Sequence, residues 1–292
     1  VRVQFGAESG NQEVLDMYNK KISVKQITEA VDILFNTNIL SIFANFIIGG
    51  PLETRETFDK TLMMVEDLII RAPGVFECNS SFLSPYLGTD IRKNFNKYKI
   101  RLVDQDFKTA SSDSYVFACP EGLTKNDLLK MKNEFTDIVN KTMIKLIPNL
   151  PNEIIKRQLE STFLGLVTNW GTLLIKDKIY SRWMQLRRSG CQSSITSVDD
   201  QNIFIPIRTF QIDLVIDSVL FWESRQVWIT FSEFEFFLIE HASGKITMEE
   251  IIQMAGNVYF SPGTDLSVIR NKILNYYNEL AGEFLLLYKR FC

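Results

Sequence analysis

Short apolar segments alternate with amphipathic segments through the first 90 residues, and this alternation constrains the fold more than any other feature of the chain. Residues 39–49 are a continuous apolar run rich in branched side chains, which is typical of a strand buried on both faces of a parallel sheet. Ser23 and Gln26 form a capping box that opens a helix before this run. The helix repeats apolar residues at helical spacing: Val24, Ile27, Val31 and Leu34. Strands separated by helices predict right-handed βαβ units, a parallel sheet and an α/β fold.

Each of the three strands expected in this part ends in a polar or glycine-rich loop. The strand over residues 1–6 leads into Glu8-Ser9-Gly10, and residues 39–49 lead into Gly50-Pro51-Leu52-Glu53. The third strand begins near Val75 and leads into Pro85-Tyr86-Leu87-Gly88-Thr89. Ligands of parallel sheets bind at the carboxyl ends of the strands. We therefore expect a ligand site where these three loops meet.

Composition excludes several classes of function. The chain carries 32 basic and 35 acidic residues, a net charge of −3, which argues against a polycationic nucleic-acid-binding protein. His241 is the single histidine, so a histidine-rich metal site is excluded. The four cysteines have no short spacing, which indicates reduced thiols in a cytoplasmic protein. Residues 163–175 form the longest apolar run, too short to cross a membrane, and we interpret it as a buried helix.

The sequence after residue 148 predicts a helical connector and a separate C-terminal domain. Residues 148–153 are typical of a hinge, and the polar stretch 189–202 is typical of a domain boundary. We predict domains over residues 1–148 and 201–292, joined by a helical connector over 149–200. The last domain should contain strands at 204–220 and 226–229, three helices and a closing strand at 283–288. Two of its helices begin with capping boxes: Ser232 with Glu235, and Thr247 with Glu250.

Strand, three helices and strand is the order of a winged-helix module. Residues 201–292 hold seven basic and eleven acidic residues, so this module should bind DNA poorly.

Three motifs carry a resemblance to a known family. "FGAESGNQEVLDMYNKK" (5–21), "NFIIGGPLET" (45–54) and "FLSPYLGTDI" (82–91) resemble the last three strands of a radical S-adenosylmethionine barrel. The closest group often carries an N-terminal cobalamin-binding domain. The resemblance covers residues 1–143. It implies an α/β fold that is the C-terminal half of a partial (β/α)6 barrel.

The resemblance assigns cofactor-binding roles. Glu8 and Ser9 would face S-adenosylmethionine and hydrogen-bond its ribose or methionyl part, since a cationic, hydroxyl-rich ligand needs an ionised acceptor. Ile47, Gly49 and Pro51 would flank the adenine. An ordinary strand-to-helix turn with a capping acid is the alternative for the first pair.

Tyr86 would stack on the adenine or line the substrate pocket, with core packing as the alternative. Leu52 and Leu87 stand where the family commonly has a glycine and a proline.

The family's cluster motif, CxxxCxxC, is absent from the sequence. In the family, three thiolates of that motif hold a [4Fe–4S] cluster at which S-adenosylmethionine is cleaved to a 5′-deoxyadenosyl radical. We therefore expect the chain to be the C-terminal portion of a longer protein, with the cluster ligands and any cobalamin domain before Val1. No catalytic residue and no metal ligand is assigned within the chain. Whether the protein is an enzyme stays open: a non-catalytic module that binds a peptide or partner is the alternative.

The last domain resembles the PqqD-like modules found beside radical enzymes of peptide maturation. The resemblance rests on the order of "ITFSEFEFFLIEHASGKITMEEIIQMAG" (229–256) and the long helix that follows. Such modules can bind a leader peptide by adding a strand to a sheet edge. The resemblance therefore implies an unidentified substrate that could be a peptide. A domain that only braces the barrel is the alternative. The first strand should have an unpaired edge, which favours self-association.

Overall fold

A computed structural model describes residues 1–103, 115–195 and 204–290 of the chain. It divides into two compact units. Unit 1 comprises Val1–Leu150 together with Thr168–Trp170, and unit 2 comprises Pro151–Val167 together with Gly171–Cys292. The predicted three-domain division stays a prediction, and much of its expected boundary at 189–202 lies outside the described residues.

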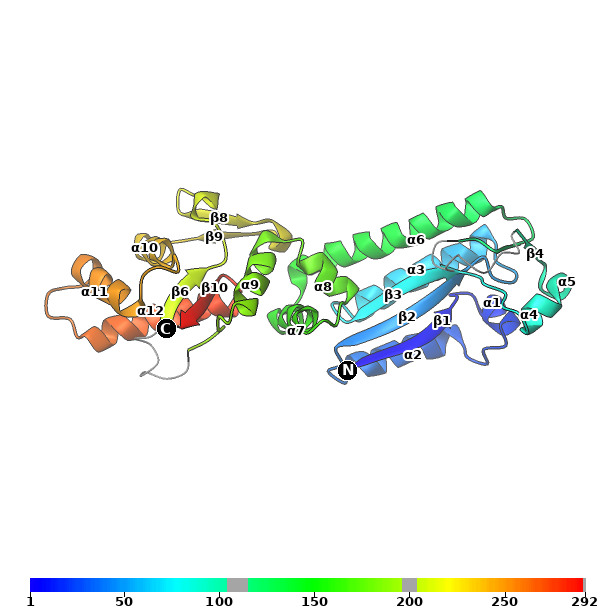
Figure 1. Ribbon diagram of the computed structural model, residues 1–292, viewed down its shortest axis with the longest axis horizontal. Coiled ribbons are helices and arrows are strands. Elements are labelled where there is room, and N and C mark those ends of the chain that lie inside the picture. Colours follow the sequence, from blue (N-terminus) through cyan, green and yellow to red (C-terminus); the bar gives the residue numbers. More distant parts are fainter. Residues whose placement is uncertain (104–114, 196–203, 291–292) are drawn as a thin grey trace. The chain divides into compact units, whose positions relative to one another are not determined.

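Unit 1 contains the predicted parallel sheet (Figure 1). Strands β1 (Arg2–Glu8), β2 (Ser41–Ile48) and β3 (Phe76–Phe82) pair in parallel in the order β1-β2-β3. Strand β2 therefore lies at the centre, and β1 and β3 lie at the edges of the sheet. The mixed α/β class expected from the alternating sequence is confirmed in this part of the chain.

The helices of unit 1 begin where the local sequence provides a cap. Ser23 forms the predicted capping box, and Thr54 forms another with Thr57. The long helix α6 follows Thr124, packs along α3 and contacts β2 and β3. The helices are α1 (Gln12–Met17), α2 (Val24–Phe35), α3 (Arg55–Arg71) and α6 (Lys125–Leu146).

The two faces of the sheet differ in burial. Phe46 packs against Phe135 of α6 with ring centroids 5.6 Å apart. Its face of β2 is fully buried through Ile42, Ala44, Phe46 and Ile48. On the opposite face Phe43, Asn45 and Ile47 are only half-buried. The expectation that β2 is buried on both faces is therefore wrong for the described residues: one face is fully buried and the other is half-buried.

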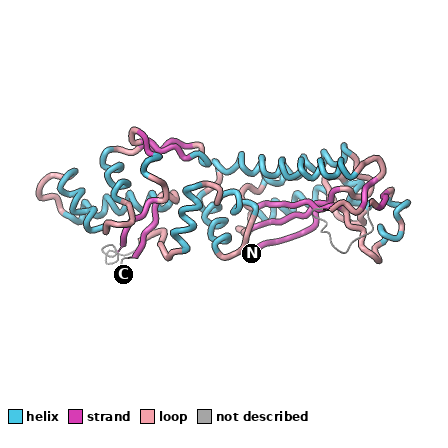
Figure 2. Tube along the Cα trace, turned by 45° about the horizontal axis from the view of Figure 1, so that its top comes forward, coloured by secondary structure: helices cyan, strands magenta, loops and turns pink. Residues whose placement is uncertain are grey.

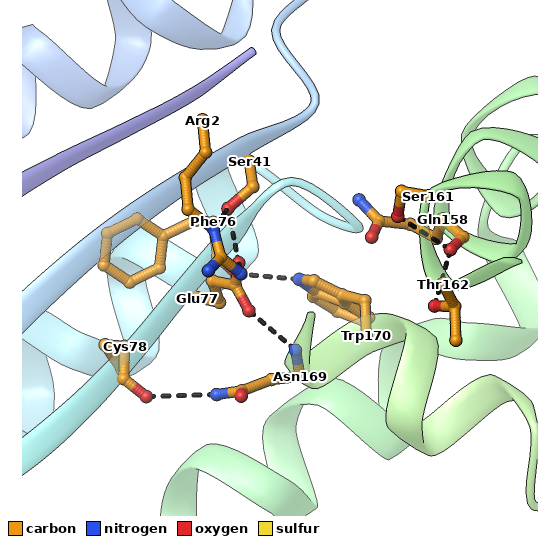
Figure 3. Close-up of polar contacts among 10 residues, drawn as sticks. All are labelled: Arg2, Ser41, Phe76, Glu77, Cys78, Gln158, Ser161, Thr162, Asn169 and Trp170. Carbon is orange, nitrogen blue, oxygen red and sulfur yellow. Dashed lines mark hydrogen bonds and ion pairs between the residues drawn. The ribbon is translucent and has the colours of Figure 1, made fainter. Parts of the chain in front are cut away.

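At the amino-terminal ends of the strands, polar groups form a satisfied network around Glu77 (Figure 3). The Glu77 carboxylate is fully buried and accepts hydrogen bonds from Arg2 (2.6 Å), the Ser41 hydroxyl and the Asn169 backbone N–H (2.6 Å). The Trp170 indole donates to the Phe76 carbonyl at 2.7 Å. Residues 168–170 thus supply hydrogen-bond donors to carbonyl groups on the outer edge of β3. Without these donors the carbonyl groups of this edge strand would be unpaired.

Short elements follow β3 and cover part of the carboxyl end of the sheet. Leu83, Tyr98, Ile100 and Ala118 form a small buried cluster, and Met17, Tyr18 and Ile47 pack against it. The elements are α4 (Asp90–Lys93), α5 (Phe95–Tyr98), β4 (Ile100–Leu102) and β5 (Ala118–Pro120). The 3-10 helix η1 (Ile147–Asn149) follows α6. Strands β4 and β5 pair antiparallel.

The apolar run at 163–175 is not one buried helix, so that interpretation is wrong. Helix α7 (Asn152–Phe163) ends at the start of the run, and α8 (Asn169–Leu174) begins after a break. Gly165 in the break has a φ of +84°. The side chains of Leu164, Leu166 and Val167 are more than half exposed. Within the described residues, none of the helices is both long enough and apolar enough to cross a membrane.

The last part of unit 2 has the predicted order of strand, three helices and strand. Strand β6 (Phe204–Arg208) pairs antiparallel with β10 (Leu286–Arg290), a few residues later than the expected closing strand. Between them lie α10 (Glu233–His241), α11 (Met248–Tyr259) and α12 (Leu266–Gly282), after α9 (Lys178–Arg188) earlier in the unit. Ser232 and Thr247 form the predicted capping boxes.

The single strand predicted at 204–220 is wrong. The chain leaves β6 through the 3-10 helix η3 (Ile212–Leu214), and an antiparallel three-stranded sheet then forms (Figure 2). Asp217 and Ser218 have φ values of 51° and 63°, so these two residues reverse the chain. The strands are β7 (Val215–Ile216), β8 (Val219–Trp222) and β9 (Val227–Thr230), with the 3-10 helix η4 (Glu223–Arg225) between the last two.

Candidate functional site

Strand β1 ends in a bulge that redirects Glu8. The pairing register with β2 shifts between Gly6 and Glu8, and Glu8 adopts a φ of 61°. Bulges redirect side chains, and a left-handed non-glycine residue is strained. A Cβ atom on Gly6 would lie 2.1 Å from the Glu8 Oε1 atom. Only a glycine at position 6 therefore lets the carboxylate fold back over the strand.

The Glu8 carboxylate forms an ion pair with Lys20 at 2.7 Å. Lys20 Nζ also donates to the Gly6 carbonyl at 3.3 Å. Gly6 pairs with Asn45, and Asn45 pairs with Asn79, so the three residues form one row across the sheet. Because the carboxylate occupies the side of Gly6 where a Cβ would lie, it sits on the half-buried face of the sheet.

Ser9 lies in a different environment from Glu8. Its side chain is fully buried, and its hydroxyl accepts the Asn11 backbone N–H at 3.1 Å. The same hydroxyl lies 3.2 Å from the Thr61 hydroxyl of α3, which also accepts the Gly10 N–H at 2.9 Å. In this arrangement Ser9 fixes the loop against α3.

The loop after β2 is a tight turn with an unusual residue at its third position. The Glu53 N–H donates to the Gly50 carbonyl at 3.2 Å across Pro51 and Leu52. Leu52 has a φ of 60°. Proline followed by a residue with positive φ is the pattern of a type II turn, whose third position favours glycine. Leu52 therefore occupies, with its backbone strained, the position at which the resemblance expects glycine.

Two ionisable groups are enclosed behind this turn. The Glu53 side chain is 1% exposed and accepts the Gly49 N–H. Burial raises the pKa of Glu53 to about 8, against the lowering effect of the Gly49 and Gly50 N–H groups. The Tyr18 hydroxyl is buried with no hydrogen-bond partner among the described residues. Burial, with the charges of Glu53 and Glu8, raises the pKa of Tyr18 well above its usual value.

Gly50 makes room for that hydroxyl. A Cβ atom on Gly50 would lie 1.9 Å from the Tyr18 oxygen. An uncompensated buried hydroxyl costs about 1–3 kcal/mol. The carboxyl end of the sheet therefore holds a polar group whose partner is not supplied by the described residues.

Four of the predicted site residues lie at the carboxyl ends of β1 and β2 or in the turn after β2, and Tyr86 lies in the loop after β3. Glu8, Ile47 and Gly49 lie at the carboxyl ends of neighbouring strands, and Pro51 is buried in the turn that follows. Tyr86 lies in the loop after β3, and its side chain is 62% exposed. Within the described ranges, no group of three His, Cys, Asp or Glu residues could hold a metal ion.

Three residues near Glu8 were given no role from the sequence: Tyr18, Lys20 and Glu53. Tyr18 and Lys20 follow the short helix α1, and Glu53 closes the turn after β2. All three lie inside the first two motifs, so their position in the motifs was the available signal. Their mutual proximity depends on the pairing of β1 with β2, which a local pattern does not encode.

No family model matches the chain. A 67-residue segment, 23% of the chain, is 36% identical to part of the anaerobic magnesium-protoporphyrin IX monomethyl ester cyclase of Rubrivivax gelatinosus. The segment spans 12% of the length of that cyclase. This partial match supports the radical S-adenosylmethionine superfamily and no finer assignment.

Proposed function

We propose that the chain is part of a radical S-adenosylmethionine iron–sulfur enzyme and that unit 1 is the C-terminal half of its partial (β/α)6 barrel. The three motifs, the parallel order β1-β2-β3 and the partial match to the cyclase support this proposal. The observation that carries it is Glu8, an acid held in a strained conformation at the carboxyl edge of the sheet. Such strain is concentrated at functional sites.

The residues at this edge fit S-adenosylmethionine. Glu8 offers a carboxylate acceptor for a ribose hydroxyl or the methionyl ammonium, in exchange for Lys20. The Tyr18 hydroxyl offers a second polar group that lacks a partner among the described residues. Ile47 and Gly49 offer an apolar side chain and backbone for the adenine. In this proposal Ser9 acts by fixing the loop that carries Glu8.

The described residues do not fit an iron–sulfur cluster, because none of their acids, cysteines and histidines gather in groups of three. The proposal therefore places the cluster ligands outside this chain, and cobalamin, if used, in a further domain. S-adenosylmethionine bound to a [4Fe–4S] cluster supplies a 5′-deoxyadenosyl radical. The role of this chain is to hold the cofactor and to face the substrate with the half-buried side of the sheet.

The test is the affinity of the complete, cluster-bearing protein for S-adenosylmethionine, measured by equilibrium dialysis. Glu8→Ala should weaken binding about ten- to a hundredfold, because a hydrogen bond to a charged acceptor contributes about 1.5–3 kcal/mol. Glu13→Ala is the matched control, since Glu13 is exposed on α1. Unchanged affinity in a folded Glu8→Ala protein would refute the assignment of Glu8.

A second candidate function is peptide binding by unit 2, which the exposed strand β9 favours. In the described sheet β9 pairs only with β8, so its other edge has unpaired backbone groups. Trp228 on β9 is 71% exposed and packs against Phe221 with ring centroids 4.4 Å apart. An extended peptide could add as a further strand there, with Trp228 as an apolar contact.

The probe for this second function is a set of synthetic peptides encoded beside the gene, titrated against the full chain with tryptophan fluorescence as the readout. Thr230→Pro should abolish binding that uses the β9 backbone, whereas Lys245→Ala should leave it unchanged. Duplex DNA should bind poorly because residues 201–292 are acidic overall. No binding by any of these peptides would favour the bracing role.

A further inference from the structure

Unit 2 contains a cavity of about 670 Å³ whose wall is strongly basic. It lies between α9, β6 and the segment that follows α10. Four basic residues line it: Lys176, Lys178, Arg182 and Arg208. The described residues contribute no acidic side chain to this wall. We call it the cationic cavity.

This charge opposes the balance of the surrounding chain. Residues 201–292 hold seven basic and eleven acidic residues, and the whole chain has a net charge of −3. The sequence 176–188 contains five basic residues, which on their own indicate an ordinary solvated helix face. The structure instead brings three of them together with Arg208 from a distant strand. Like charges gathered around a concavity raise the local concentration of anions.

The three cations near α9 are available for a ligand. Among the described residues Lys176, Lys178 and Arg182 form no ion pair, and Arg182 donates a hydrogen bond to the Gln185 side chain at 3.4 Å. Asp177 lies between the two lysines in sequence, but its carboxylate accepts the N–H groups that open α9 and the Trp222 indole at 3.0 Å. The nearest acid in the sequence is therefore already engaged by hydrogen bonds.

Arg208 supplies a fixed group. Its Nη1 atom donates to the carbonyls of Ile239 and Glu240, both at 3.0 Å, at the end of α10. Its Nε atom is buried with no partner among the described residues. The guanidinium is thus held in place by the helix end while one of its donors is unsatisfied. A planar guanidinium with a free donor matches the oxygen geometry of phosphate.

The remaining wall combines apolar side chains, among them Ile179, Ile207 and Phe210, with uncharged polar ones: Ser181, Gln185, Thr209, Gln211 and Ser243. Ile179 and Phe210 are buried, and Ile207 is half-buried. A volume of this size lies within the usual range for small-molecule sites, which combine apolar walls with a few placed polar groups. We propose that the cationic cavity binds a small phosphorylated molecule with an apolar body. The phosphate would contact Arg182, Lys178 and Arg208, and the body would pack on Phe210.

The experiment is a titration of the full chain with 1-naphthyl phosphate, followed by fluorescence anisotropy. The comparison ligands are 1-naphthol, which lacks the charge, 1-naphthoate, which lacks the dianionic head, and inorganic phosphate, which lacks the apolar body. Phosphate is not fluorescent, so its affinity is measured by displacement of 1-naphthyl phosphate. We expect 1-naphthyl phosphate to bind at least tenfold more tightly than each of the three. Equal binding of 1-naphthol, or tighter binding of 1-naphthoate, would overturn the proposal.

Two charge reversals and one matched control locate the binding. Arg182→Glu and Lys178→Glu should each weaken the affinity for 1-naphthyl phosphate at least tenfold. Lys178→Glu places an acid in the first turn of α9, which favours the helix, so a loss of binding there is not a loss of folding. Arg188→Glu reverses an exposed charge on the same helix outside the cavity and should change the affinity less than twofold. An equal loss in Arg188→Glu would show non-specific attraction and refute the site.

Discussion

Each end of the parallel sheet contains a buried glutamate, and the two glutamates differ in their hydrogen-bond partners. At the amino-terminal ends, Glu77 accepts hydrogen bonds from Arg2, Ser41 and the Asn169 backbone, so its charge is compensated. At the carboxyl ends, Glu53 accepts backbone N–H groups, and its pKa is raised to about 8.

The carboxyl end also concentrates strain and an unpaired group. Glu8 and Leu52 have positive φ values there, and the Tyr18 hydroxyl has no partner among the described residues. In α/β barrels, residues at the amino-terminal face maintain stability and residues at the carboxyl face serve chemistry. The proposed function predicts the same division between the two ends of this sheet, and substituting one residue at a time tests it.

The largest expected effect is at the amino-terminal end. Glu77→Ala should lower the free energy of unfolding by about 2–6 kcal/mol, because the Ser41 hydroxyl and the Asn169 N–H lose their buried acceptor and each costs about 1–3 kcal/mol when unsatisfied. Urea denaturation followed by circular dichroism measures the change. Glu66→Ala, on the exposed side of α3, is the control and should alter stability by less than about 0.5 kcal/mol. A loss below about 1 kcal/mol for Glu77→Ala would contradict the stabilising role of the network.

A pH-dependent effect is expected at the carboxyl end. The folded pKa of Glu53, about 8, lies above its ordinary value of 4.5, so the folded chain holds an extra proton between these pH values. The stability contributed by this proton is full below pH 4.5 and is lost as the pH rises through 8. The free energy of unfolding should therefore fall by about 1.4 kcal/mol per pH unit within this window.

Glu53→Gln keeps the shape of the side chain and removes the titration. Its unfolding free energy should lack this component, so the difference from the natural chain should change steadily between pH 5.5 and 7.5. Glu56→Gln, on the exposed start of α3, should retain the natural pH profile. Parallel profiles for the natural chain and Glu53→Gln would show that Glu53 is ionised in the folded state.

The smallest effect concerns the turn after β2. A left-handed backbone conformation destabilises the folded state by about 1–2 kcal/mol for a non-glycine residue. Glycine removes this strain, but it also gives the unfolded chain more conformational entropy, which offsets part of the gain. Leu52→Gly should therefore stabilise the protein by about 0.5–1 kcal/mol in thermal unfolding. Leu52→Ala retains the strain and loses apolar contact, so it should destabilise. If both variants destabilise, the side chain of Leu52 outweighs its backbone strain.

Local patterns predicted much of the helical structure. Side chains that cap helices act over three residues, and the boxes at Ser23, Ser232 and Thr247 are all confirmed. The parallel sheet was predicted because apolar runs alternated with helical periods.

The features that the sequence did not predict depend on contacts between distant segments. The turn at Asp217 and Ser218 lacks the glycine that normally marks such a reversal, so one strand was predicted there instead of several elements. In the site, the motifs located Glu8 and the turn after β2. The pairing of Lys20 with Glu8 and the enclosure of Tyr18 follow from how β1 and β2 pair, which periodicity does not reveal.

The return of residues 168–170 to unit 1 bears on how this protein could have been assembled by gene rearrangement. Residues 151–167 belong to unit 2, but Asn169 and Trp170 complete the hydrogen bonding of β3. A crossover at residue 150 that exchanged everything downstream would remove the Asn169 N–H donor to Glu77 and the side-chain donors to the Phe76 and Cys78 carbonyls. Shuffling of the C-terminal module among parent proteins would therefore preserve the hydrogen bonding of β3 only at junctions beyond residue 170. The segment that must be inherited together therefore extends to residue 170, well beyond the three strands of the sheet.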